Sequence, residues 1–260
     1  MHKPVFLFDI DKTLTNLNRE VSPRTKTVLT KLQDQGFMLN VATGRKFQTI
    51  YDNILQLFKP DCLHITSGGG EIITTQGNII WQKKLNPEAL EQIYRLSRKF
   101  GAKLHFGFDN FYVADNDLLA RFKKHNWKVE LKPFSYQYYH DLTEVTVHGL
   151  NQELNLAFKS LSNITIKTMT AYDGTPYADI TAKNVTKATT MKRWARLLNI
   201  DLKDVVAIGD SSNDIEMLKL AGQGIAMGNA TEDVKAVADE IIGHTNNDGL
   251  AKYLEQFIKA

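Results

Sequence analysis

Apolar runs of strand length alternate with helical patterns in two separate stretches of this chain, and this alternation restricts the fold more than any other feature. In the first stretch, we expect strands at residues 5–8, 37–41 and 63–65, a helix from Ser22-Pro23 to Gly36, and an amphipathic helical segment at 47–58. In the second, we expect helices at 187–198, 215–220, 231–238 and 250–258, and strands at 205–208, 224–227 and 241–242. Such alternation predicts βαβ units and a parallel sheet.

The segment between these stretches follows a different pattern. A hairpin is predicted for residues 71–74 and 79–82, with Gly77-Asn78 in its turn. Beyond it we expect helices at 87–99, 116–127 and 151–161, and strands at 103–108, 111–114, 143–148, 164–169 and 177–181. We therefore predict an α/β fold: a doubly wound, mostly parallel Rossmann-like core formed by residues 1–83 and 184–260, with an inserted α+β domain at 84–183.

Two carboxylates follow the first apolar run. In an extended segment, residues i and i+2 point the same way, so Asp9 and Asp11 can converge on one metal ion or one substrate while Ile10 faces the core. A cation would offset the cost of bringing two like charges together, and Mg²⁺ accepts one or two carboxylates. Alone, such a pair also fits the capping of a turn.

Further polar residues follow other strands at the edge where ligands bind in open parallel sheets. Thr43-Gly44-Arg45 follows the second strand, Lys187 opens the first helix after the insertion, and the segment from Gly209 to Asp214 follows the strand at 205–208. A lysine in the first turn of a helix opposes the helix dipole, which is easier to explain if an anion lies nearby. Together these groups are the parts that phosphoryl transfer from a monoester requires.

Each part has an expected task. The carboxylate of Asp9 can attack phosphorus to give an aspartyl phosphate, and Asp11 can protonate the leaving alkoxide and then deprotonate the attacking water. Mg²⁺ is expected on Asp9, Asp210 and a backbone carbonyl. Thr43, the Gly44 amide and Lys187 are expected to bind the other phosphoryl oxygens.

In this order, the motifs resemble those of the haloacid dehalogenase-like hydrolase superfamily. The matching segments are D-x-D-x-T at 9–13, A-T-G-R at 42–45, N-V-T-K at 184–187 and G-D-S-x-N-D at 209–214. Residues 226–230, 238–239 and 247–249 further resemble the Cof-type phosphatase branch, which carries an α/β cap where the insertion lies here.

The resemblance implies a Mg²⁺-dependent phosphatase acting on small phosphorylated metabolites such as sugar phosphates. It implies that Asp9 is the nucleophile, that Asp11 is the general acid/base and also a main-chain metal ligand, and that Thr43 and Lys187 bind phosphate. Asp210 is implied as the direct metal ligand, and the supporting residues for metal and phosphate are Asp214 and Asn213.

Two positions depart from the pattern of the Cof-type branch. Lys12 replaces a glycine, and we expect its side chain to point into solvent rather than to add a cation beside the phosphate. Gly68-Gly69-Gly70 replaces an asparagine-glycine pair after the third strand, which puts in doubt a substrate contact that some relatives make.

Three other functions stay open. A phospho-accepting receiver domain would use a similar acid cluster, but Asp11 and an insertion of about 100 residues disfavour it. A phosphomutase would pass the phosphoryl group to a second sugar hydroxyl. A non-catalytic phosphosugar-binding protein is favoured only by Lys12.

Composition narrows the class of protein further. With a formal net charge of only +3 and no Lys/Arg run longer than a pair, nothing in the sequence suggests binding to nucleic acid, and no apolar segment is long enough to span a membrane. Cys62, the only cysteine, is expected to be a buried and inert thiol, which favours a cytoplasmic protein.

The choice of substrate is expected to depend on the cap. Residues 136–140 and 172–175 are candidates there, although packing or a solvated loop is the favoured role for both, and nothing in the sequence indicates the oligomeric state.

Overall fold

The central sheet is parallel throughout. The computed structural model describes residues 3–108, 111–124, 129–171 and 174–259. Five strands lie in the order β14-β13-β12-β1-β2, with each neighbouring pair parallel. They span Val5–Phe8 (β1), Met38–Val41 (β2), Val205–Gly209 (β12), Gln223–Ala226 (β13) and Glu240–Ile241 (β14). The order runs outward from β1 in both directions, which confirms the predicted doubly wound core.

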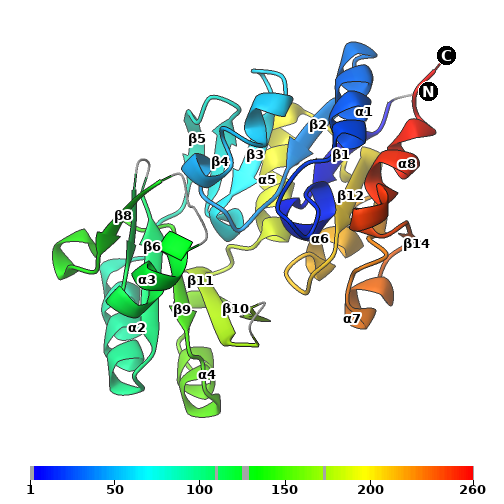
Figure 1. The fold of residues 1–260 in the computed structure, drawn as a ribbon. Helices are drawn as coiled ribbons and strands as arrows, with labels where there is room; N and C mark the ends of the chain where they lie inside the picture. The colour runs from blue at the N-terminus through cyan, green and yellow to red at the C-terminus, as the bar shows by residue number, and fades with distance from the viewer. Residues whose placement is uncertain (1–2, 109–110, 125–128, 172–173, 260) are drawn as a thin grey trace.

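Helices cover both faces of this sheet (Figure 1). Phe6 and Phe8 of β1 pack in one cluster with α1 and α8, whereas Val5 and Leu7 pack in another with α5 and α6. The helices span Pro23–Asp34 (α1), Lys187–Leu198 (α5), Ile215–Leu220 (α6), Glu232–Lys235 (α7) and Gly249–Glu255 (α8). A strand buried on both faces has no polar side, which is why β1 is continuously apolar up to Asp9.

The predicted hairpin is present, but it belongs to a separate antiparallel sheet. Its strands are Leu63–Thr66 (β3), Glu71–Thr74 (β4) and Ile79–Gln82 (β5). One isolated parallel bridge, between Ala42 and Ile65, connects β3 to the end of β2. The expectation that residues 63–65 form a full strand of the parallel sheet was therefore wrong, because β3 pairs along its length with β4 instead.

The helical segment predicted at residues 47–58 was also wrong. The chain forms only two short 3₁₀ turns there, Phe47–Thr49 and Leu55–Leu57. Asp52 and Asn53 lie between them, and no side chain caps the first turn at Lys46. Residues of these types favour turns over helix interiors. The apolar periodicity instead reflects burial of Ile50, Ile54 and Leu55 in the core.

The inserted segment folds around a six-stranded sheet beside the core, in the order β10-β11-β9-β6-β7-β8 (Figure 1). The strands span Lys103–Gly107 (β6), Phe111–Ala114 (β7), Glu130–Pro133 (β8), Glu144–His148 (β9), Ile164–Thr170 (β10) and Pro176–Ala182 (β11). The helices span Pro87–Lys99 (α2), Asn116–Lys124 (α3) and Gln152–Lys159 (α4). The helix corresponding to α3 was predicted to end at residue 127, and residues 125–127 lie outside the described residues.

Strand β8 was missed by the sequence analysis, and it pairs in parallel with β7. The helices predicted at 231–238 and 250–258 are shorter than expected. Short 3₁₀ or π turns span Ile10–Leu14, Ser67–Gly69, Tyr136–Tyr138, Leu202–Asp204 and Thr245–Asn247. The fold class is confirmed, while the exact domain boundaries at residues 83/84 and 183/184 stay a prediction. In the described part of the chain, no helix has the length and apolar character needed to cross a membrane.

Candidate active site

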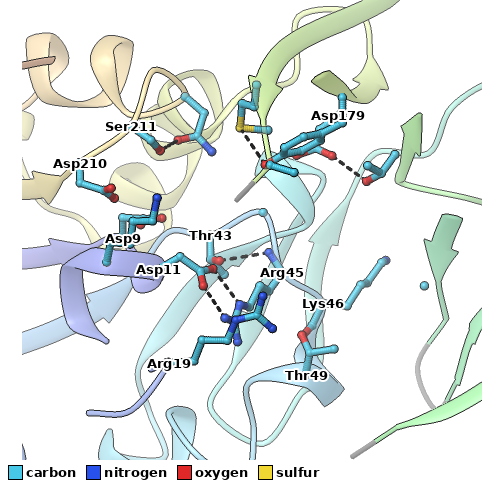
Figure 2. A pocket seen from close by; sticks show the side chains of 18 of the residues that line it. Asp9, Asp11, Arg19, Thr43, Arg45, Lys46, Thr49, Asp179, Asp210 and Ser211 are labelled. Carbon is cyan, nitrogen blue, oxygen red and sulfur yellow. Dashed lines mark hydrogen bonds and ion pairs between the residues drawn. The ribbon is translucent and has the colours of Figure 1, made fainter. Parts of the chain in front are cut away.

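A cavity of about 1450 Å³ lies at the carboxyl ends of β1, β2 and β12. Its core wall includes six of the predicted site residues, namely Asp9, Asp11, Thr43, Gly44, Asp210 and Asn213. Its opposite wall comes from the inserted sheet, and Figure 2 shows Asp179 there, facing the loops that carry the core residues. The topology therefore brings together residues that are about 200 positions apart in sequence.

Three buried carboxylates form the centre of the core wall. Asp9, Asp210 and Asp214 each offer an oxygen atom, and these atoms all lie within 4.8 Å of one another. Lys187 lies behind them: its Nζ donates to Oδ1 of Asp9 at 2.6 Å and to Oδ1 of Asp214 at 2.7 Å. Lys187 is the first residue of α5, so these two carboxylates offset its unfavourable position in the helix dipole.

The clustered negative charges of these aspartates favour binding of a cation. Burial raises the pKa of Asp9, opposed by Lys187 and reinforced by the other aspartates. Burial and the charge of Asp214 raise the pKa of Asp210 to about 7. Three carboxylates against one ammonium leave an excess of negative charge when all are ionised. An all-oxygen donor set of this kind fits Mg²⁺, so Asp9, Asp210 and Asp214 could hold this ion.

Asp11 has a different environment, although it was predicted with the metal ligands. Its carboxylate is not part of the three-membered group and instead accepts two hydrogen bonds from Arg45. Nε of Arg45 lies 2.8 Å from Oδ2, and Nη2 contacts Oδ1. Burial acts to raise the pKa of Asp11, but the guanidinium outweighs it and holds the pKa below its ordinary value. The main-chain metal contact implied for Asp11 stays a prediction.

The predicted phosphate-binding residues divide into two groups. Thr43, Gly44 and Asn213 line the cavity, whereas Lys187 and Asp214 do not belong to its wall. Oγ1 of Thr43 accepts a hydrogen bond from the Arg45 amide at 3.1 Å, which holds the loop after β2 in place. Asp214 accepts hydrogen bonds from the amides of Asp210 and Ser211, both at 3.2 Å. It therefore also orients the loop after β12.

Lys12 lies nearer to the aspartates than expected. It is half-buried, lines the cavity, and its charge helps to lower the pKa of Asp210 against the dominant effect of burial. Its backbone lies in the left-handed region at φ 61°, where a glycine would be unstrained. Nδ2 of Asn229 donates to its carbonyl at 2.9 Å, which fixes this turn.

Close backbone packing explains why glycine occurs in the loop after β3. Gly69 has φ 103°, and a Cβ there would lie 2.4 Å from the carbonyl oxygen of Thr186. The residue preceding Lys187 thus rests directly on this loop. Only glycine allows this close approach.

Sequence reasoning missed several residues around the cavity. The sequence analysis named Arg45 only as part of a motif and gave it no role. Its place directly after Gly44, in the loop where phosphate is expected, was the feature that could have identified it as a site residue. Nζ of Lys46 donates to Oε1 of Glu71 at 2.5 Å, and this buried ion pair joins the loop after β2 to β4. The same Nζ donates to Oγ1 of Thr143 at 2.7 Å, which joins this loop to the inserted segment. No sequence pattern indicated that pairing.

Three other sequence expectations concern residues away from the aspartates. None of residues 136–140 lines the cavity, which agrees with the favoured packing role, and Tyr136 and Tyr139 pack on Tyr94 and Phe134. Tyr172 and Asp173 lie outside the described residues. Cys62 is half-buried rather than buried, and burial raises the pKa of its thiol to about 11.

Comparison with known proteins agrees with this geometry. The sequence model of the haloacid dehalogenase-like hydrolases matches residues 6–254. An HMP-PP phosphatase of Cronobacter sakazakii is 26% identical over 257 residues, covering 96% of this chain and 94% of the relative. A 5-amino-6-(5-phospho-D-ribitylamino)uracil phosphatase of Bacillus subtilis is 27% identical over 253 residues, again with 96% and 94% coverage.

Solved structures show the same fold. A phosphatase of this superfamily from Bacteroides thetaiotaomicron superposes with a TM-score of 0.84 at 24% identity, covering 98% of this chain and 95% of its own. A subclass IIB sugar phosphatase superposes with a TM-score of 0.84 at 25% identity, covering 98% and 99%. The resemblance found in the motifs is thereby confirmed over nearly the whole chain.

Proposed function

This chain belongs to the haloacid dehalogenase-like hydrolases, and we propose that it is a Mg²⁺-dependent phosphatase that hydrolyses small phosphate monoesters through an aspartyl phosphate. The observation that carries the proposal is the buried group of Asp9, Asp210 and Asp214 around Lys187, with Asp11 two residues beyond Asp9. Relatives that act on phosphorylated metabolites support the substrate class.

In the first step, a carboxylate oxygen of Asp9 attacks phosphorus, and the bond between phosphorus and the ester oxygen breaks. Asp11 donates a proton to the leaving oxygen, so the product is a neutral alcohol. Thr43 and the Gly44 amide, which line the cavity, would donate hydrogen bonds to the phosphoryl oxygens. Lys187 holds Asp9 in a fixed orientation through their 2.6 Å contact.

In the second step, Asp11 takes a proton from water while the water oxygen attacks phosphorus. The bond between phosphorus and Asp9 breaks, which releases inorganic phosphate, restores the Asp9 carboxylate and returns Asp11 to the protonated form that the first step uses. Mg²⁺ held by Asp9, Asp210 and Asp214 would supply charge neutralisation to the phosphoryl group. Asn213 lines the cavity beside these ligands and would contact substrate phosphate.

The test is release of p-nitrophenol from p-nitrophenyl phosphate with Mg²⁺ and with EDTA. We expect turnover only with Mg²⁺, and we expect Asp9→Asn to abolish it because an amide cannot act as the nucleophile. Asp61→Asn, which changes an exposed aspartate outside the cavity, is the matched control and should keep wild-type turnover. Absence of Mg²⁺-dependent turnover in wild type, or full turnover by Asp9→Asn, would contradict the proposal.

A further inference from the structure

Residues 83–85 carry the chain into the inserted segment over a short distance. The amide of Lys83 donates to the carbonyl of Gly70 at 2.9 Å, and the amide of Leu85 donates to the carbonyl of Leu142 at 2.8 Å. Gly70 directly precedes β4, which lies outside the inserted segment, and Leu142 lies just before β9 within it. Two parts of a chain joined in this way move relative to each other unless further contacts hold them.

The ammonium group of Lys46 bridges the same boundary. Its Nζ donates at 2.5 Å to Oε1 of Glu71, the residue after Gly70, and at 2.7 Å to Oγ1 of Thr143, the residue after Leu142. Oγ1 of Thr143 in turn donates to Oε1 of Glu71 at 3.1 Å, so the three side chains all contact one another. All three are buried, and water therefore competes little for these contacts.

The inserted segment also holds the backbone of Lys46. The Lys46 amide donates to the hydroxyl oxygen of Tyr112, on β7, at 3.3 Å. A Cβ on Gly107 of β6 would lie 2.9 Å from Cγ of Lys46 and 2.7 Å from Cζ of Tyr112, so glycine leaves room for both side chains. Lys46 thus lies in a loop of the core but contacts the inserted segment through its amide, its stem and its ammonium group.

Lys46 directly follows Thr43-Gly44-Arg45, the segment expected to receive phosphate, and Figure 2 shows Thr43, Arg45 and Lys46 in this loop. The carbonyl of Arg45 accepts a hydrogen bond from the Ser67 amide at 3.1 Å, and the Ser67 hydroxyl donates to Oε2 of Glu71 at 2.9 Å. Glu71 is therefore connected to the phosphate loop by two routes, one through Lys46 and one through Ser67.

The Lys46–Glu71 pair is costly to break from one side only. Burial acts to raise the pKa of Glu71, but the charge of Lys46 outweighs it and holds the pKa below its ordinary value. Removing one partner of a buried ion pair leaves the other charge uncompensated, whereas replacing both by neutral groups of similar volume is often nearly neutral for stability. The pair is therefore better suited to fixing an arrangement than to stabilising the fold.

We propose that Lys46 is a positioning residue that couples the inserted segment to the phosphate-binding loop. Thr143 and Tyr112 hold Lys46 in place, and Lys46 in turn places Thr43 and Gly44 for the phosphoryl group. Its ammonium group is engaged by Glu71 and Thr143, so it acts through the loop rather than on the phosphate. The catalytic consequence rests on the proposed phosphatase function, whereas the coupling itself is a property of the folded chain.

A paired substitution separates positioning from stability. The double variant Lys46→Met/Glu71→Gln removes both charges and keeps similar volumes, so its Tm should stay close to that of wild type. With p-nitrophenyl phosphate and Mg²⁺, we expect its kcat to fall by about tenfold or more while KM changes less, because small misplacements of positioning groups are costly in rate. A purely structural role predicts that kcat recovers together with Tm, and wild-type kcat in this variant would overturn the inference.

An exposed ion pair beside the same boundary provides the matched control. Nζ of Lys84 lies 3.2 Å from Oδ1 of Asp141, and both side chains are exposed and outside the cavity wall. Exposed pairs of this kind contribute little. Lys84→Met/Asp141→Asn should therefore keep the kcat and KM of wild type. An equal fall in kcat in this control would show that any lost charge pair near residues 83–85 has the same effect, which would contradict a specific role of Lys46.

Amide hydrogen exchange, measured by NMR on the ligand-free protein, tests the coupling without turnover. Thr143→Val removes one acceptor of Lys46 within the inserted segment and keeps the shape of the side chain. The amides of Ser67 and Gly68 donate to the carbonyls of Arg45 and Thr43, and we expect them to exchange faster by about three- to tenfold, the effect of losing one hydrogen bond.

The exchange result separates this inference from the phosphatase proposal. Faster exchange at Ser67 and Gly68 in Thr143→Val would support the coupling even if no phosphate ester were hydrolysed. Unchanged exchange at both amides would overturn the inference and leave the phosphatase proposal in place. Lys84→Met/Asp141→Asn should exchange as wild type does at these two amides.

Discussion

Arg45 and Asp11 form a two-point ion pair at the mouth of the predicted phosphate site. Nε and Nη2 of the guanidinium each donate to a different carboxylate oxygen. A planar fork of this kind fixes both the charge and the orientation of a carboxylate. In the empty site Arg45 thus favours the ionised form of Asp11, which is the form that accepts a proton from water, whereas the first proposed step uses the protonated form. The arginine itself lines the cavity that receives the phosphate.

Replacing Asp11 by asparagine should separate the two proposed steps. With alkyl phosphates we expect kcat to fall by about 10² to 10⁴, the usual contribution of general acid–base catalysis. p-Nitrophenolate leaves without a proton, so the first step should survive with that substrate while attack by water slows. Stopped-flow absorbance should then show a burst of about one p-nitrophenol per site. Wild-type turnover in Asp11→Asn would contradict the role of this residue.

The contribution of Arg45 should depend on Asp11. Arg45→Lys keeps the positive charge but loses the fork, and we expect kcat/KM to fall by about tenfold, since one charge-assisted hydrogen bond is worth roughly 1.5–3 kcal/mol. In the Asp11→Asn background, the same change should cost much less. A double-mutant cycle with steady-state kinetics measures this. Strictly additive losses would show that Arg45 acts independently of Asp11.

Mg²⁺ should stabilise the folded chain through the three aspartates, independently of turnover. At a Mg²⁺ concentration of 100 times Kd, binding should add about 2.7 kcal/mol to the free energy of unfolding. For a chain of this size this corresponds to a rise in Tm of about 5 °C or more. Asp210→Asn should lose this rise, because it removes one of the three carboxylates within 4.8 Å of each other. Differential scanning calorimetry with Mg²⁺ and with EDTA measures both proteins.

The same variant has a second expected effect. In EDTA, Asp210→Asn should be at least as stable as wild type, because it removes repulsion that raises the pKa of Asp210. Asp61→Asn should respond to Mg²⁺ as wild type does, since this residue is exposed. Equal Mg²⁺ shifts in wild type and Asp210→Asn would contradict the metal assignment.

The parallel core could be predicted because its signals are local. The continuous apolar run of β1 and the Ser22 cap with proline at the first turn of α1 each indicate their element within a few residues. The carboxyl ends of parallel strands then share one edge of the sheet, so Asp9, Thr43 and Asp210 could be grouped without knowledge of any contact.

Contacts between loops could not be predicted in this way. The pairing of Arg45 with Asp11 depends on backbone angles in two loops, including the left-handed conformation of Lys12. The failure at residues 47–58 has a related cause, because core burial of Ile50 and Ile54 mimics helical periodicity without a helix. The sequence of β9 did indicate a strand with one polar face, because Glu144, Thr146 and His148 alternate with two valines. Only the structure shows that this polar face lines the cavity.

A buried histidine in the core makes the stability of this chain sensitive to acid. Nδ1 of His64 accepts a hydrogen bond from the Val41 amide at 3.2 Å, and Nε2 lies 3.0 Å from Oγ1 of Thr75, which itself donates to the Lys59 carbonyl. This arrangement requires the neutral ring with its proton on Nε2. Burial lowers the pKa of His64 from 6.5 to about 3.

The direction of the pH effect follows from proton binding. Below pH 6.5 the unfolded chain takes up a proton at His64 that the folded chain excludes, so stability is complete above 6.5 and falls progressively towards pH 3. When the pH falls from 7 to 5, the titration of this residue should lower the free energy of unfolding by about 2 kcal/mol. Urea unfolding at both pH values measures the loss. His64→Gln lacks the titrating ring and should lose about 2 kcal/mol less than wild type over that interval, whatever its stability at pH 7. Equal losses in the two proteins would show that His64 titrates alike in the folded and unfolded chains.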